Sequence, residues 1–418
     1  MSGWAERRLH FVGIGGAGMS GLALVCAQLG AAVSGSDRDD SSYMERLRLA
    51  GLEPVVGHDA ANLPAGAEVI VSTAIAADNP ELALARERGL VVRHRGELLA
   101  ELCAEKRLIA VAGTHGKTTT TAMLAWALRK LGADPAFFVG GEVPGLGPQG
   151  ATANAGWGAG EWAIAEADES DASLLDLKPE IAVVTNIEMD HHSRWGSIAE
   201  LRAAFARFAE GATLAEFDRD SPGPDVLKLA VPGRHNLLNA RAALAAAGVA
   251  GFDLEALADA LGDFPGVHRR LELKGEREGA RLYDDYAHHP TEVRAALEAL
   301  REMEPARLVV AFQPHLYSRT RALAEQFGAA LALADEAIVL DVYPAREQPV
   351  GELAGVSGLD VARAASDRMG GRATIWAPTL ERAQAALSPR LGAGVIAATI
   401  GAGDVFQVGE ALLAEGAR

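Results

Sequence analysis

Residues 108–121 read LIAVAGTHGKTTTT, and this stretch decides the fold of the segment around it. A short apolar run ends in a glycine turn, and an Ala/Leu-rich run with helical character follows at 122–131. A strand, a Gly-Lys-Thr turn and a helix in this order are typical of a phosphate-binding loop, whose backbone N–H groups surround the phosphates. We expect Lys117 to reach the β- and γ-phosphates of a nucleotide and Thr118 to ligate Mg²⁺.

This loop departs from the standard pattern in one respect. The usual first glycine falls at position 111, which is Val111, so Gly113 takes that role in a shorter loop. A threonine-rich helix start is the structural alternative, but Gly-Lys-Thr after a strand has few structural uses. The residues expected to surround the phosphates are Gly113, Thr114, His115, Gly116, Lys117, Thr118 and Thr119.

The same alternation of short β-type runs and longer helical runs extends through the whole chain. The β-type runs include 9–14, 31–36, 69–73, 90–93, 162–167, 181–187, 281–286, 308–312, 336–340, 373–377 and 394–400. Because parallel strands need a crossover helix, this order predicts an α/β fold with mostly parallel sheets. At about 150 residues per domain, the chain holds about three domains. We expect their bounds at 1–106, 107–265 and 266–418.

Composition excludes several classes of protein. The 39 basic and 56 acidic residues give a net charge of −17, which disfavours nucleic acid and anionic membranes as partners. Two cysteines make neither a disulfide framework nor a cysteine metal site. The amino terminus has no secretory pattern and no run approaches 18 apolar residues, so we expect a cytoplasmic protein.

A second glycine-rich turn lies near the amino terminus. Residues 13–18 read GIGGAG between an expected strand and an expected helix, which suits a diphosphate. Asp37 ends the next strand, where a ribose-binding carboxylate belongs. Ser72 and Thr73 follow another strand and either line the same crevice or simply cap that strand. The motif leaves a nicotinamide cofactor and a nucleotide-sugar equally open.

Acidic and histidine residues follow two strands of the central segment. EADESDAS at 166–173 concentrates four carboxylates, which repel one another unless a cation lies among them. TNIEMDHH at 185–192 ends the next strand. Oxygen ligands with substrate phosphates suit Mg²⁺, and Mn²⁺ also fits if a histidine takes part. The alternative is a solvated acidic loop with surface histidines.

The last third carries paired cations and histidines near strand ends. These include Arg269-Arg270, Asp284-Asp285, His288-His289 and Arg319 with Arg321. Arginine can neutralise a transferred phosphoryl group or clamp a carboxylate, and histidine can orient an amine; surface charge, helix caps and satisfied histidines are the alternatives. His235 and Asn239 lie four apart on one helix face, where they either hold a nucleotide base or cap the helix.

Taken together, these motifs resemble the Mur ligases along essentially the whole chain. The resemblance is carried in order by GIGGAGMSG (13–21), GTHGKTTTT (113–121), EADESDAS (166–173), TNIEMDHH (185–192), PGRHNLLNA (232–240), RR (269–270), DDYAHHP (284–290) and FQPHLYSRT (312–320). It implies a Rossmann-like domain that binds the UDP moiety, a P-loop ATPase-like domain, and a dinucleotide-fold-like domain that closes on ATP and brings an amino acid.

The resemblance also implies the chemistry and the roles of single residues. ATP activates the carboxylate of UDP-N-acetylmuramate as an acyl phosphate, and L-alanine then attacks, a step of peptidoglycan precursor synthesis. Catalysis would involve Lys117, Glu166, His191, Arg270 and His288. The metal ligands would be Thr118, Glu166 and His191. ATP would contact residues 113–119 and also His235, Asn239, Arg270 and Asp285. The UDP moiety would contact Gly15, Gly16, Ala17, Gly18, Asp37, Ser72 and Thr73. The amino acid would contact His288 and Arg319.

Two departures from the family pattern stand out. The stretch between His191 and His235 is short, which predicts a trimmed edge of the central sheet with the ATP site kept. Position 316 is Leu where relatives often carry Arg, so one cation of that cluster is absent. We expect a monomer or a homodimer.

Three other functions compete with this interpretation. The nearest is a ligase of the same family that joins a whole tripeptide to UDP-N-acetylmuramate. A dehydrogenase would use the turn at 13–18 for a nicotinamide, but it would leave Lys117 and the acidic cluster without a task. A nucleotide-binding regulator would have lost catalysis together with the missing central segment.

Overall fold

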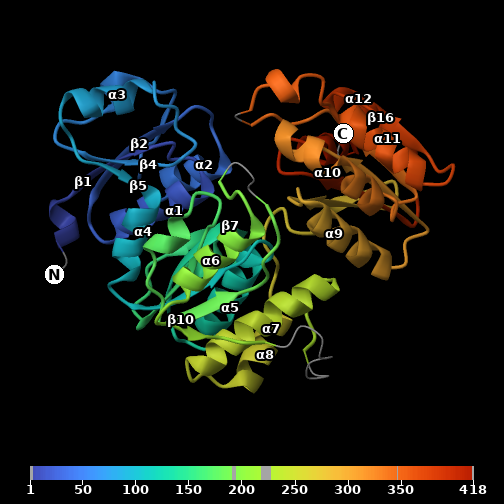
Figure 1. Cartoon of the computed structure of the whole chain (residues 1–418). Helices are drawn as coiled ribbons and strands as arrows, with labels where there is room; N and C mark the ends of the chain where they lie inside the picture. Colours follow the sequence, from blue (N-terminus) through green and yellow to red (C-terminus); the bar gives the residue numbers. More distant parts are fainter. Residues whose placement is uncertain (1–2, 191–193, 218–226, 346, 417–418) are drawn as a thin grey trace. The chain divides into compact units, whose positions relative to one another are not determined.

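The computed structural model describes residues 3–190, 194–217, 227–345 and 347–416 (Figure 1). Its contacts group the chain into two compact units. The first comprises Met1–Ala230 and Leu237–Val267, and the second comprises Val231–Asn236 and His268–Arg418. The first unit contains two β-sheets and the second unit contains one.

The first sheet is fully parallel, with the strand order β3-β2-β1-β4-β5. Its strands are β1 (Arg8–Val12), β2 (Ala32–Asp37), β3 (Val55–Val56), β4 (Glu68–Val71) and β5 (Val92–His94). Its helices are α1 (Ala17–Gln28), α2 (Ser42–Leu49), α3 (Pro80–Glu87) and α4 (Arg95–Cys103). Leu9 and Phe11 of β1 join the core on the α1 side, whereas Val12 packs with Ala85 of α3. Both faces are therefore buried, as a parallel sheet requires.

The second sheet has the order β11-β10-β6-β9-β7-β8, and only the β7–β8 pair among these strands is antiparallel. The strands are β6 (Arg107–Ala112), β7 (Ala136–Val143), β8 (Ala153–Gly156), β9 (Trp162–Glu166), β10 (Ile181–Val184) and β11 (Thr213–Leu214). The helices are α5 (Lys117–Lys130), α6 (Ile198–Phe208), α7 (Arg234–Val249) and α8 (Leu254–Gly262).

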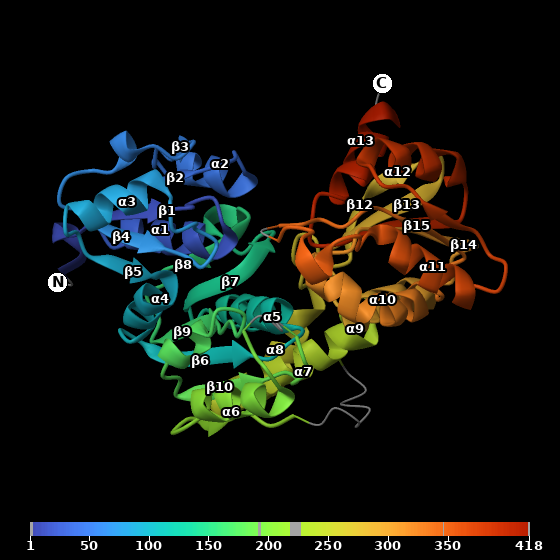
Figure 2. The ribbon, with the colours of Figure 1, turned by 45° about the horizontal axis from the view of Figure 1, so that its top comes forward.

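The first two sheets are joined through α1, which lies beside β7 and β8 (Figure 2). The Asn154 amide of β8 donates a hydrogen bond of 2.7 Å to the Ala17 carbonyl of α1. A Cβ at Gly21 would lie 2.9 Å from that of Ala155, so the helix approaches the strand closely. This contact fixes the first sheet against the second within one unit.

The third sheet has the order β12-β13-β17-β14-β15-β16, with β12 antiparallel to β13. The strands are β12 (Glu272–Arg277), β13 (Ala280–Asp285), β14 (Arg307–Phe312), β15 (Glu336–Val339), β16 (Thr374–Trp376) and β17 (Val395–Ile400). The helices are α9 (Pro290–Glu302), α10 (Tyr317–Leu331), α11 (Gly358–Arg368), α12 (Leu380–Leu387) and α13 (Phe406–Gly416). Alternate residues of β14 enter two different cores, Val310 in one and Val309 in the other.

The expected α/β class with mostly parallel sheets is confirmed. The strands β7, β8 and β12 were not expected, and they supply the antiparallel pairs. The edge strand β11 pairs with β10 over two residues, and the bridge expected at 217–226 lies almost wholly outside the described residues. The bounds of three domains stay a prediction. Among the described helices, none has the length and apolar character needed to cross a membrane.

Candidate functional site

The glycine turn at 13–18 connects β1 to α1 and is held by the end of β2. The Ser36 carbonyl accepts hydrogen bonds from the backbone N–H groups of Gly13 and Ile14 at 2.8 and 2.9 Å. The Asp37 carboxylate accepts another from the Gly15 N–H at 2.8 Å. Gly13 has a φ of +84°, which favours glycine. Gly16 caps α1 without a side-chain acceptor, so the first turn of the helix suits an anion.

The turn after β4 lies beside the glycine loop. The Ile75 side chain would lie 2.9 Å from a Cβ placed on Gly13. Ser72 begins this turn and accepts a hydrogen bond from the Ala74 N–H at 3.3 Å, while Thr73 is exposed. The structure therefore places Asp37, the glycines and the Ser72 turn at the carboxyl ends of three strands of the same sheet.

The second loop, at 113–117, connects β6 to α5, and two of its glycines have left-handed backbone. Gly113 and Gly116 have φ values of +130° and +80°. A Cβ on Gly113 would overlap the Thr185 hydroxyl, and a Cβ on Gly116 would overlap the Asn239 amide oxygen. The loop therefore packs closely against the end of β10 and against α7, and Asn239 lies beside the expected phosphate site.

Lys117 is mostly shielded from solvent, with 11% of its side chain exposed, and it contacts two carbonyls and one carboxylate. Its ammonium donates to the Gly113 and Thr114 carbonyls at 2.7 and 3.2 Å, and it pairs with Glu169 at 2.8 Å. Burial disfavours the ammonium, but Glu169, Asp168 and Glu166 outweigh that effect and raise the pKa of Lys117 above its ordinary value. Lys117 is therefore charged, as phosphate binding requires.

Glu166, at the end of β9, lies next to Thr118. The Thr118 hydroxyl donates a hydrogen bond of 2.9 Å to one carboxylate oxygen, and the Gly140 N–H donates one of 2.7 Å to the other. Burial raises the pKa of Glu166, with Lys117 opposing the shift. A half-buried carboxylate and a hydroxyl at hydrogen-bonding distance form the oxygen-rich donor set that Mg²⁺ prefers.

The other acids of the 166–173 run do not gather around one cation. Glu169 pairs with Lys117, whereas Asp168 and Asp171 pair with Arg95, which begins α4 of the first sheet. Two basic side chains, Arg95 and Lys117, therefore lie among these carboxylates. The metal ion expected there stays a prediction.

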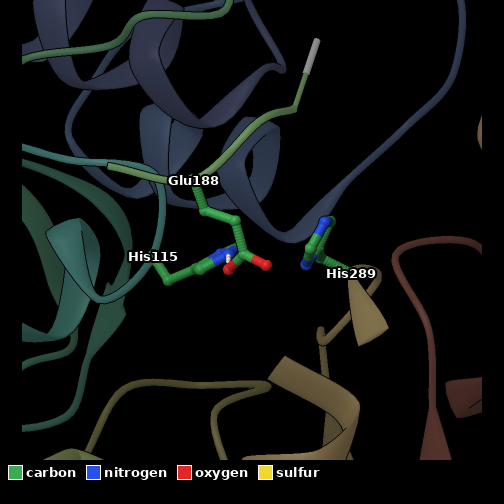
Figure 3. Close-up of side chains that lie close together, drawn as sticks. All are labelled: His115, Glu188 and His289. Atoms are coloured by element: carbon green, nitrogen blue, oxygen red, sulfur yellow. Dashed lines mark hydrogen bonds and ion pairs between the residues drawn. The ribbon is translucent and has the colours of Figure 1, made fainter. Parts of the chain in front are cut away.

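The segment after β10 supports the loop backbone. The Asn186 amide oxygen accepts from the His115 N–H at 2.9 Å, and the Thr185 hydroxyl donates to the His115 carbonyl at 2.6 Å. The His115 ring contacts the Glu188 carboxylate at 3.0 Å (Figure 3). His191, the third expected metal ligand, lies outside the described residues.

Arg270, Asp285 and His235 belong to the second unit. Asp285 ends β13 and accepts hydrogen bonds from the Leu271 and Ala287 N–H groups, each at 2.7 Å. Burial raises the pKa of Asp285 to about 6, against the opposing charge of Arg270. Burial, aided by Arg270, lowers the pKa of His235 to about 4. Arg270 therefore acts electrostatically on both residues.

The expected amino-acid residues lie in an aromatic cluster of the second unit. The His288 ring lies edge-on to His315 at 5.8 Å, and His315 stacks on Tyr343 at the same separation. Arg319 is 4% exposed and its guanidinium lies 3.3 Å from the His315 ring. His288 and Arg319 are thus joined through His315.

Two side chains of the cation and histidine pairs in the last third of the chain have structural roles. His289, also labelled in Figure 3, is the N-cap of α9 and forms a capping box with Glu292. Arg321 is half-exposed and pairs with Glu352 on the surface. For both, the alternative weighed from the sequence fits the structure.

Sequence reasoning missed several residues of the site. Arg95, Thr185, Asn186, Gly140 and His315 contact residues that were expected there. Thr185 and His315 lie inside motifs in which only the neighbouring charged residues were considered as site residues. Arg95 carried no local signal, because its partners Asp168 and Asp171 are 73 and 76 residues away.

Three family models match the chain. The Mur ligase family catalytic domain matches residues 8–107, the Mur ligase middle domain matches 111–222, and the Mur ligase glutamate ligase domain matches 269–403. Together they cover each of the three sheets.

Known proteins are similar along the whole chain. The UDP-N-acetylmuramate–L-alanine ligase of Renibacterium salmoninarum is 44% identical over 456 residues, covering 97% of this chain and 95% of the relative. The crystal structure of a UDP-N-acetylmuramate–alanine ligase from Thermotoga maritima matches with a TM-score of 0.82, 30% identity and 98% coverage of both chains. A murein peptide ligase from Psychrobacter arcticus shares the fold, with a TM-score of 0.70, 23% identity and 98% coverage of both chains. The chain belongs to the Mur ligase family.

Proposed function

We propose that this enzyme joins L-alanine to the carboxylate of UDP-N-acetylmuramate, at the expense of ATP, in peptidoglycan precursor synthesis. The single observation that carries the proposal is the charged Lys117 in its phosphate loop, beside the Thr118–Glu166 pair and in the same compact unit as the glycine loop. The alanine-adding relatives at 42–44% identity support the choice of amino acid.

The reaction proceeds in two displacements. The muramate carboxylate attacks the γ-phosphorus of ATP, a P–O bond to ADP breaks, and an acyl phosphate forms. The amine of L-alanine then attacks the acyl carbon, loses a proton, and expels inorganic phosphate to leave an amide. Lys117 stabilises the charge on the transferred phosphoryl group, as a fixed cation with little exposure to water does most effectively.

Thr118 and Glu166 would hold a Mg²⁺ ion, with His191 as the third ligand expected from the family resemblance. When bound, this ion neutralises charge on the phosphates of ATP, and Mn²⁺ would serve in its place. Before binding, the Thr118 hydroxyl donates a hydrogen bond to Glu166, so both oxygens are already close together.

The remaining roles follow the family resemblance. Gly15 to Gly18, Asp37, Ser72 and Thr73 hold the UDP moiety, and the loop 113–119 holds ATP with Asn239. We assign ATP contacts to His235, Arg270 and Asp285, and amino-acid contacts to His288 and Arg319. Domain bounds at 1–106, 107–265 and 266–418 are part of the proposal, as are a cytoplasmic location and a monomeric or homodimeric state.

The test is ADP formation with UDP-N-acetylmuramate and a choice of amine. We expect ADP release that depends on L-alanine and is at least tenfold faster than with L-alanyl-D-glutamyl-diaminopimelate, since a difference of about 1.4 kcal/mol in transition-state binding gives that factor. ADP release only with the tripeptide would identify the recycling ligase instead. ATP binding without release by any amine would show a protein that has lost catalysis.

A further inference from the structure

Arg95 connects the glycine loop of the first sheet with the acidic segment of the second. It is the first residue of α4 and directly follows β5. Its Nε donates to Asp171 at 3.1 Å, and its Nη2 donates to Asp168 at 2.9 Å and to Asp171 at 2.6 Å. Two carboxylates therefore hold one edge of the guanidinium plane.

The remaining nitrogen of Arg95 points to the glycine loop. A Cβ built on Gly18 would lie 3.0 Å from Nη1, so this nitrogen lies against the first turn of α1. Within the described part of the chain, Nη1 has no hydrogen-bond acceptor, although its two neighbours on the guanidinium are satisfied. Gly18 is in regular helix, so an alanine there would meet only the Arg95 side chain.

Asp168 and Asp171 hold the Arg95 guanidinium in a fixed orientation in addition to neutralising its charge. The Asp171 side chain also accepts from the Ser173 N–H at 3.0 Å, and Asp168 accepts from the Ser170 N–H at 3.0 Å. Both acids are thereby fixed by their own loop. Because a guanidinium is planar, fixing two of its nitrogens also fixes the direction of the third.

We propose that Arg95 is a binding residue for the diphosphate of the sugar-nucleotide, with Nη1 donating to a phosphate oxygen and with Asp168 and Asp171 as its positioning residues. The proposal rests on the proposed function for the identity of the ligand. Beside the backbone N–H groups of the helix end, a guanidinium N–H offers a diphosphate one further, charge-assisted hydrogen bond. Arg95 is a cation placed against that helix turn.

The experiment measures the affinity of UDP-N-acetylmuramate and of a non-hydrolysable ATP analogue by calorimetry, without catalysis. Arg95→Lys keeps the charge but cannot hold both carboxylates and reach Gly18. We expect it to weaken sugar-nucleotide binding about tenfold, as the loss of one charge-assisted hydrogen bond does, and to leave the affinity for the ATP analogue within about twofold. Gly18→Ala displaces Nη1 of Arg95, so it should weaken the binding of UDP-N-acetylmuramate by a similar factor.

Arg93→Lys is the matched control. Arg93 lies two residues earlier on β5 and pairs with Glu68, Glu97 and Glu101, away from the glycine loop. It should leave both affinities unchanged. Asp171→Asn should weaken sugar-nucleotide binding, and its effect should not add to that of Arg95→Lys, because both act through one guanidinium.

Two results would overturn the proposal. One is an unchanged affinity for UDP-N-acetylmuramate in both Arg95→Lys and Gly18→Ala. The other is an equal loss of affinity for UDP-N-acetylmuramate and for the ATP analogue, together with a lower melting temperature. That result would show that Arg95 only stabilises the contact between the two sheets. Failure of the proposed function is distinguishable, because the parent protein would then bind no UDP-N-acetylmuramate at all.

Discussion

Beneath the glycine loop, Glu81 forms a buried hydrogen-bond network with His10 and Ser36. The Glu81 carboxylate is fully buried and contacts the His10 ring at 3.1 Å and the Ser36 hydroxyl at 2.6 Å. The Asn62 amide and the Asp59 N–H donate to its other oxygen at 2.9 and 3.1 Å. Since Ser36 also holds Gly13 and Ile14 through its carbonyl, this network supports the loop that we assign to the diphosphate.

Glu81 makes the stability of the first sheet depend on acid pH. Burial raises its pKa, but the hydrogen bonds from His10, Ser36 and Asn62 lower it from 4.5 to about 2. A carboxyl with a depressed folded pKa stabilises the fold above its unfolded pKa and loses that contribution as the pH falls. We expect stability to fall between about pH 4.5 and pH 2, and Glu81→Gln to cost about 3 kcal/mol at pH 7.

Chemical unfolding followed from pH 2.5 to pH 7 tests this expectation. Glu87→Gln, at the exposed end of the same helix, is the control and should behave as the parent protein does. A Glu81→Gln variant that retains the full acid dependence of the parent would show that other groups cause it.

At the scale of elements, the two ends of α5 offer a matched pair of glycines. Gly116 precedes the helix and Gly132 follows it, with φ values of +80° and +76°. A Cβ on Gly132 would meet nothing within 4 Å, whereas one on Gly116 would overlap Asn239. Replacement by alanine should cost about 1 kcal/mol of backbone strain at either position.

Only Gly116→Ala should also weaken the binding of ATP. We expect it to raise the KM for ATP by about tenfold or more, because the loop must move away from α7 to fit the new methyl group. Gly132→Ala should lower the melting temperature and leave the KM for ATP unchanged. Equal kinetic constants for the two variants would mean that the close contact with Asn239 has no role in nucleotide binding.

Strands were predictable from the sequence where a continuous apolar run marked them. They were not predictable where glycines or charged residues interrupt the run. The buried strands β6, β14 and β17 are continuous apolar runs. The strand β7 was missed because Gly140 and Gly141 interrupt its pattern, and β12 because ELKGER is a charged edge strand. The glycine loops were predictable from local spacing, but the Arg95–Asp171 contact depends on tertiary structure, which no spacing encodes.

We assign two anion sites of this molecule to two sheets of its first unit. Among the described residues, the Lys117 ammonium bonds only to its own loop and to Glu169, so it has no direct link with the glycine turn at 13–18. We therefore expect Lys117→Ala to lower turnover by at least about 100-fold, as loss of a preorganised cation does, and to leave the affinity for UDP-N-acetylmuramate unchanged.

Calorimetry of the folded Lys117→Ala variant checks this separation. Lys130→Ala, at the far end of α5, is the control and should retain full turnover. A folded Lys117→Ala variant that loses sugar-nucleotide binding in proportion to its loss of turnover would contradict the division into two sites.

The fate of the carboxylate oxygens of UDP-N-acetylmuramate shows whether ATP activates the acid. UDP-N-acetylmuramate labelled with ¹⁸O in its carboxylate is incubated with ATP, Mg²⁺ and L-alanine, and the phosphate released is analysed by mass spectrometry. An acyl phosphate requires that each phosphate formed carries one oxygen from the carboxylate, so the account predicts singly labelled phosphate. Release of unlabelled phosphate with amide formation would contradict activation of the acid by ATP.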